Sequence, residues 1–133
     1  MGTIVDTSVL VAAQRAEIDL GALLRTLPNH DVATATICVS ELLHGPHRMA
    51  NAVARARAER SVETLLAGLS IVSFDLEIAR LHARLGADLA AKGTKIGAHD
   101  LIIAATALFL DYRVATRDLR RFPRIPELDV VKW

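Results

Sequence analysis

Five short apolar runs, most of them rich in valine and isoleucine, recur along the chain. Apolar and polar positions do not strictly alternate in them, which is typical of buried strands in a parallel sheet. The predicted strands are Thr3–Val5, Val32–Ala35, Ser70–Ser73, Tyr112–Ala115 and Asp129–Lys132.

Longer segments between these strands repeat apolar residues at helical spacing. Thr36 is expected to cap a helix over Ile37–His44, and the pair Gly45-Pro46 is expected to end it. Gly97–Leu110 is apolar nearly all round and predicts a buried helix. The other predicted helices are Ile18–Leu27, 48–69 and Leu76–Ala91. This alternation predicts an α/β fold with a parallel sheet that carries helices on both faces.

Composition narrows the class of protein. A length of 133 residues suits a single domain over 1–133, and 52% apolar residues exclude a mainly disordered chain. The single cysteine, Cys38, excludes a disulfide scaffold and fits a reducing compartment. The longest apolar stretch, Leu101–Leu110, is too short for a membrane span, and the chain opens without a recognisable secretion signal. We therefore expect a cytoplasmic protein that has no membrane contact.

Four acidic residues stand where a parallel sheet can gather them at one edge. Asp6 ends the first predicted strand, Asp118 follows the fourth, and Glu41 lies about one turn into the helix after the second. Asp100 lies near the start of the helix Gly97–Leu110. In open α/β sheets, sites form beyond the carboxyl ends of the strands. Each acid also has a structural alternative, because Asp6, Asp100 and Asp118 can cap a helix or turn and Glu41 can be a surface acid.

Carboxylates crowded at one edge repel one another, and a hard divalent cation relieves that repulsion. Mg²⁺ and Mn²⁺ prefer oxygen ligands, so four acids can hold one or two such ions. A bound ion would orient and deprotonate a water and stabilise charge on a phosphodiester. A metal role for His44 and His47 is not expected, because Gly45-Pro46 separates them. A substrate contact of His99 stays open.

Arginines are concentrated in two segments although the net charge is only +1. Guanidinium groups match the geometry of phosphate, so both segments are candidate nucleic-acid contacts. The first segment contains Arg113, Arg117, Arg120, Arg121 and Arg124, and the second contains Arg48, Arg55, Arg57 and Arg60. The second segment also fits a solvated helix face.

Four segments, in order along the whole chain, resemble the motifs of PIN-domain ribonucleases, and within them of the VapC-like toxins of bacterial toxin–antitoxin pairs. They are Ile4–Leu10, Ser40–Gly45, Gly93–Ala105 and Ala115–Phe122. The last segment departs from the family pattern, because Arg121 stands where an acid often precedes the phenylalanine. This departure leaves open a catalytically silent PIN-like module that binds RNA or protein. A receiver-like phosphoacceptor domain is disfavoured, because its site pairs adjacent acids early in the chain and Asp6 stands alone.

The resemblance implies a three-layer α/β/α fold with five parallel strands in the order 3-2-1-4-5, which brings Asp6 beside Asp118. It implies an endoribonuclease that depends on Mg²⁺ or Mn²⁺, with a small VapB-like antitoxin as partner and a homodimeric state. The implied catalytic and metal-binding residues are Asp6 and Asp100, foremost, with Glu41 and Asp118. Thr7, Thr116 and Arg117 are expected to contact these carboxylates or the RNA phosphate.

Overall fold

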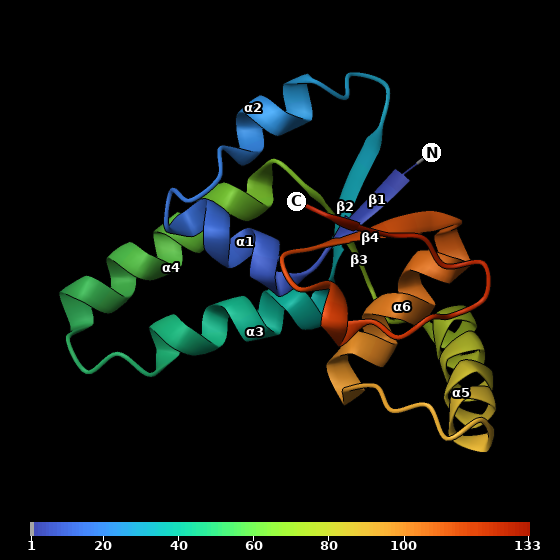
Figure 1. Ribbon diagram of the computed structural model, residues 1–133. Coiled ribbons are helices and arrows are strands. Elements are labelled where there is room, and N and C mark those ends of the chain that lie inside the picture. The colour runs from blue at the N-terminus through green and yellow to red at the C-terminus, as the bar shows by residue number, and fades with distance from the viewer. Residues whose placement is uncertain (1) are drawn as a thin grey trace.

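The computed structural model describes residues 2–133 and has a five-stranded, wholly parallel sheet at its centre (Figure 1). The strands are β1 (Gly2–Val5), β2 (Asp31–Ala35), β3 (Ser70–Val72), β4 (Tyr112–Thr116) and β5 (Val130–Lys132). Their order across the sheet is β3-β2-β1-β4-β5, which confirms the order that the resemblance implies. Val5 of β1 pairs with Ala115 of β4, so the residues that follow these two strands emerge side by side.

Helices cover both faces of the sheet, as the alternation of strands and helices predicts. The helices α1 to α4 lie on one side, and α5 and α6 lie on the other (Figure 1). Their bounds are α1 (Thr7–Gln14), α2 (Leu20–Arg25), α3 (Thr36–His47), α4 (Ala52–Ala67), α5 (Leu76–Ala91) and α6 (Ala98–Leu110), with a short 3₁₀ turn, η1 (Leu119–Arg121). Within residues 2–133, none of the helices has both the length and the apolar character that crossing a membrane requires.

The core is built around β1, β4 and α6. Ile4 and Val5 of β1 are fully buried, and so are Val114 of β4 and Ile103 of α6. This agrees with the prediction that Gly97–Leu110 forms a buried helix. Because both faces of the central strands are covered, the polar residues at their carboxyl ends are buried as well.

One expected helix boundary is wrong. The helix predicted to end before Gly45-Pro46 continues through both residues to His47 as α3. Pro46 lies in the last turn and is buried, where tertiary packing outweighs the hydrogen bond that proline cannot donate. Thr36 is the first helical residue, whereas Ala35 occupies the N-cap and makes no side-chain capping bond.

A second expectation fails at the edge of the sheet. The run Ser70–Ser73 was expected to be a buried strand, but it forms the edge strand β3, and Ile71 is 45% exposed. An apolar run shows that a segment pairs in a sheet but not which strand takes the edge. The helices predicted over Ile18–Leu27 and 48–69 are present in shorter form, as α2 and α4.

Candidate active site

Asp6 is a fully buried carboxylate at the end of β1. It is the N-cap of α1, and its Oδ1 accepts hydrogen bonds from the backbone N–H of Ser8 at 3.0 Å and of Val9 at 3.4 Å. The hydroxyl of Ser8 also donates to Oδ1. The capping alternative for Asp6 is therefore correct, and it does not exclude a role in a site, because the bonds to Ser8 and Val9 occupy only one of the two carboxylate oxygens.

Thr116 connects Asp6 to the neighbouring strand. Its buried hydroxyl donates to Oδ2 of Asp6 at 2.7 Å and accepts the backbone N–H of Asp118 at 3.1 Å. The expectation that Thr116 contacts a carboxylate is confirmed. This contact follows from the register of β1 and β4, since Thr116 is the last residue of β4.

Asp100 approaches the same place from the other side of the sheet. It lies in the first turn of α6, where a carboxylate is favoured, and it is not the N-cap. The N-cap is Gly97. A Cβ at this position would stand 3.2 Å from Oδ2 of Asp100, so the absence of a side chain leaves space for the carboxylate. The side chain of Asp100 is 11% exposed.

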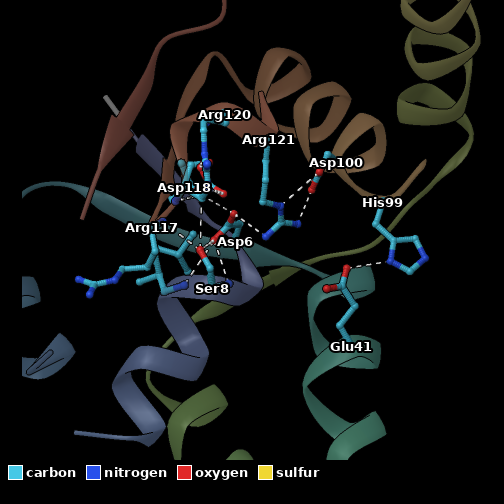
Figure 2. A network of polar contacts seen from close by, with 12 residues as sticks. Asp6, Ser8, Glu41, His99, Asp100, Arg117, Asp118, Arg120 and Arg121 are labelled. Carbon is cyan, nitrogen blue, oxygen red and sulfur yellow. Dashed lines mark hydrogen bonds and ion pairs between the residues drawn. The ribbon is translucent and has the colours of Figure 1, made fainter. Parts of the chain in front are cut away.

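Arg121 joins the two acids (Figure 2). Its guanidinium donates from Nη1 to Oδ2 of Asp6 at 3.3 Å and from Nε to Oδ2 of Asp100 at 3.3 Å, and its Nη2 contacts Oδ1 of Asp100. Burial alone would lower the pKa of Arg121, but the hydrogen bond and charge of Asp100, with the charges of Asp6 and Glu41, raise it above its ordinary value. The guanidinium is therefore a fixed positive charge between two carboxylates.

Glu41 pairs with a different partner. Its Oε1 lies 2.9 Å from Nδ1 of His99, and the two side chains, on α3 and α6, sit to one side of the Arg121 contacts (Figure 2). Ser40, Glu41, His44 and His99 line an open cleft at this point. Glu41 is partly buried rather than a fully exposed surface acid, and His99 has a partner in the predicted acid set.

Asp118 also turns away from the buried pair. Both of its carboxylate oxygens accept from Arg120, at 2.9 and 3.0 Å, and Oδ1 also caps η1 through the N–H of Arg120. These hydrogen bonds lower the pKa of Asp118. The backbone of Asp118 lies beside Asp6, as the strand order implies, but Thr116 is what connects them.

Neither Thr7 nor Arg117 contacts one of the four predicted carboxylates with its side chain, and a contact of either residue with RNA stays a prediction. Thr7 is buried, and within residues 2–133 its hydroxyl has no hydrogen-bond partner. Arg117 donates its backbone N–H to Oγ of Ser8 at 2.9 Å, while its guanidinium reaches the backbone oxygen of Trp133 at 3.2 Å. Ser8 is the site residue that sequence reasoning missed, although its position two residues after a capping aspartate was a usable signal.

The site chemistry fits a divalent cation at Asp6 and Asp100. Across residues 2–133, no three His, Cys, Asp or Glu side chains gather as a ready-made metal site. However, two nearly buried carboxylates that share a single guanidinium carry a net negative charge, and their oxygens are the ligands that Mg²⁺ and Mn²⁺ prefer. Asp6 and Asp100 are the residues that would hold such a cation.

Comparison with known proteins identifies the family of the chain. Residues 3–128 match the PIN domain family. Ribonuclease VapC of Rickettsia bellii is 35% identical over 132 residues, which cover 98% of this chain and 96% of that protein. The tRNA(fMet)-specific endonuclease VapC of Salmonella typhimurium is 29% identical over 83% of this chain and 89% of its own length. The crystal structure of VapBC2 from Rickettsia felis bound to a promoter DNA fragment contains a similar chain, with a TM-score of 0.88, 25% identity and coverage of 100% and 99%. The chain belongs to the PIN-domain family and, within it, to the VapC ribonucleases.

Proposed function

We propose that this chain is a toxin that cleaves RNA endonucleolytically with Mg²⁺ or Mn²⁺ and is held inactive by a small VapB-like antitoxin. The observation that carries the metal-dependent part is the buried pair of Asp6 and Asp100 at the carboxyl end of β1. Relatives named as VapC ribonucleases support the nuclease activity.

The chain's own residues hold and orient the two carboxylates. Ser8 and Val9 fix one oxygen of Asp6, and Thr116 directs the other toward the space that Arg121 fills. Asp6 and Asp100 would be the main ligands of the ion. Glu41 and Asp118, which are more exposed, would become additional ligands if Glu41 left His99 and Asp118 left Arg120. The ion, when bound, would activate a water and stabilise negative charge on the phosphodiester.

The decisive experiment is a cleavage assay on chelator-treated protein with total structured RNA, with and without Mn²⁺ or Mg²⁺. Asp100→Asn should abolish the cuts, because the amide carries no charge to hold the ion. Asp88→Asn is the matched control, because Asp88 is an exposed acid on α5, away from the described contacts. Cleavage that persists in Asp100→Asn would sink the proposal.

A catalytically silent binding module is the second candidate, and Arg121 favours it because the guanidinium already neutralises part of the acid pair. Such a module would bind RNA with strong salt dependence but would not bind Mn²⁺. Calorimetric titration of Mn²⁺ into the metal-free protein separates the nuclease from the silent module. Heat of Mn²⁺ binding that is present in the unaltered protein and absent in Asp100→Asn would exclude the silent module.

The antitoxin part of the proposal is supported by VapBC complexes among the similar structures. Co-expression with a candidate VapB-like antitoxin from the same genome should give a complex that elutes as one species. Two proteins that elute separately at micromolar concentration would contradict the partnership and leave the nuclease proposal standing.

A further inference from the structure

Arg121 makes a contact that a metal-binding carboxylate pair does not need. Its guanidinium lies between Asp6 and Asp100 and occupies an oxygen of one and both oxygens of the other. A carboxylate oxygen can accept a hydrogen bond and bind a cation together, but a cation shared by Asp6 and Asp100 would need the space between them, which the guanidinium occupies. Binding of one cation by both carboxylates therefore requires that Arg121 move out of that space.

The surroundings of Arg121 indicate where its guanidinium can move. It ends η1, its side chain is 30% exposed, and Arg117 and Arg120 lie close by on the same segment. A guanidinium that leaves two carboxylates needs another anion with paired oxygens, and a phosphodiester of RNA is such an anion. The two anions would then compete for one side chain.

We propose, on the basis of the proposed function, that Arg121 is a substrate-positioning residue that exchanges Asp6 and Asp100 for a phosphate of the RNA when a divalent cation binds the acid pair. Arg121 closes the pair when neither ligand is present. The cation would bind the two carboxylates and the RNA phosphate would bind the Arg121 guanidinium. Each ligand therefore breaks the ion pair that hinders the other, and linkage makes this effect reciprocal.

Calorimetric titration of Mn²⁺ into the whole chain, without RNA, tests the first half. Arg121→Gln should bind Mn²⁺ about tenfold more tightly than the unaltered protein, within the usual range of coupling between two sites. Arg124→Gln is the matched control, because it removes the same charge from an exposed position in the same segment. Equal affinities in the unaltered protein and Arg121→Gln, or an equal gain in Arg124→Gln, would overturn the proposal.

RNA binding tests the second half. Anisotropy of labelled tRNA(fMet) is measured in chelator and in Ca²⁺, with intact RNA verified on a gel. Ca²⁺ should tighten binding by the unaltered protein, and Arg121→Gln should lose this gain while it keeps its affinity in chelator. An equal loss under both conditions would mean that Arg121 already contacts RNA without metal, and the exchange would be wrong. Both readouts are independent of cleavage, so failure of the nuclease assay leaves them interpretable.

Discussion

Two pairs of acids near the carboxyl ends of the strands are held in different ways. The inner pair, Asp6 and Asp100, is buried and shares one guanidinium from η1. The outer pair, Glu41 and Asp118, is more exposed, and each member has a local partner, His99 or Arg120. Asp118 is the same residue type as Asp6 and Asp100 and yet pairs locally, so the difference comes from the fold rather than from residue type.

The comparison teaches that burial determines which carboxylates the fold holds in place. Asp6 is fixed by Ser8, Val9 and Thr116, so its position changes little whatever binds. Glu41 makes a hydrogen bond with His99 and Asp118 makes an ion pair with Arg120, both partly exposed to water, and exposed polar pairs of this kind contribute little to stability. The inner pair is therefore expected to set whether the site works, and the outer pair to adjust how well it works.

Asp6 offers the test with the largest expected effect. Asp6→Asn keeps the oxygen that caps α1 but places an NH2 where Thr116 and Arg121 donate, so the free energy of unfolding should fall by about 1–3 kcal/mol, and Asp6→Ala, which also loses the cap, should lose about 1–2 kcal/mol more. Both variants should lose metal-dependent cleavage by roughly 100-fold or more, since even outer-shell partners of metal ligands contribute 10- to 100-fold. Urea denaturation and the RNA assay measure the two effects. Substantial activity in Asp6→Asn would remove the distinction between inner and outer acids.

The sequence predicted the position of the inner pair but not its partner. The strand ending at Asp6 and the helix beginning near Asp100 followed from apolar patterns and the family motifs, and the sheet order placed β1 beside β4. Arg121 stands out in the sequence as a departure from the motif and as one of five clustered arginines, and neither feature predicts its contact with the inner pair. A side chain with several rotatable bonds can reach many partners, so no spacing rule predicts that it turns inward.

The outer pair shows that a correctly predicted backbone position does not predict the direction of the side chain. Asp118 was expected beside Asp6, and the backbone is there, but the carboxylate turns to Arg120, two residues along the chain. Ser8 stands two residues after Asp6, where a capping carboxylate bonds the backbone, but the sequence does not predict that the Ser8 hydroxyl also turns to the same oxygen. Local side-chain choices of this kind depend on the final packing and not on the pattern of apolar residues.

Thr116→Val should have the next largest effect. Valine preserves the shape of the side chain but removes the hydroxyl that donates to Asp6 and accepts from the N–H of Asp118. The buried carboxylate of Asp6 and the partly buried N–H of Asp118 each lose a hydrogen bond, which should lower the free energy of unfolding by about 1–3 kcal/mol. Cleavage should fall about tenfold, as for other supports of metal ligands. Thr106→Val in α6 is a matched control for stability alone, because its hydroxyl bonds only to the backbone of Ile102.

Glu41→Gln probes the outer pair at α3. The amide removes the charge that faces His99 at 2.9 Å, but both side chains are partly exposed, at 24% and 55%. Stability should change by less than about 1 kcal/mol. If Glu41 joins the metal only as a rim ligand, cleavage should fall by less than in Asp100→Asn, and raising the Mn²⁺ concentration should restore part of it. A loss as complete as in Asp100→Asn, unrelieved by metal, would place Glu41 with the inner acids.

Asp118 should give the smallest effect, and its pH dependence shows why. Its pKa is lowered in the folded protein by the hydrogen bonds from Arg120, so the ion pair is fully present above the carboxyl's ordinary pKa and is lost only as pH falls through the lowered value. The carboxylate therefore stays charged through the neutral range, and nothing about it titrates there. Asp118→Asn should leave the free energy of unfolding at pH 7 nearly unchanged, and the unaltered and variant proteins should diverge least in acid, where the native carboxylate becomes protonated. Cleavage profiles of the two proteins between pH 6 and pH 8 should run parallel. A profile that changes shape in the variant would show that Asp118 takes part in the reaction more directly than its contact with Arg120 suggests.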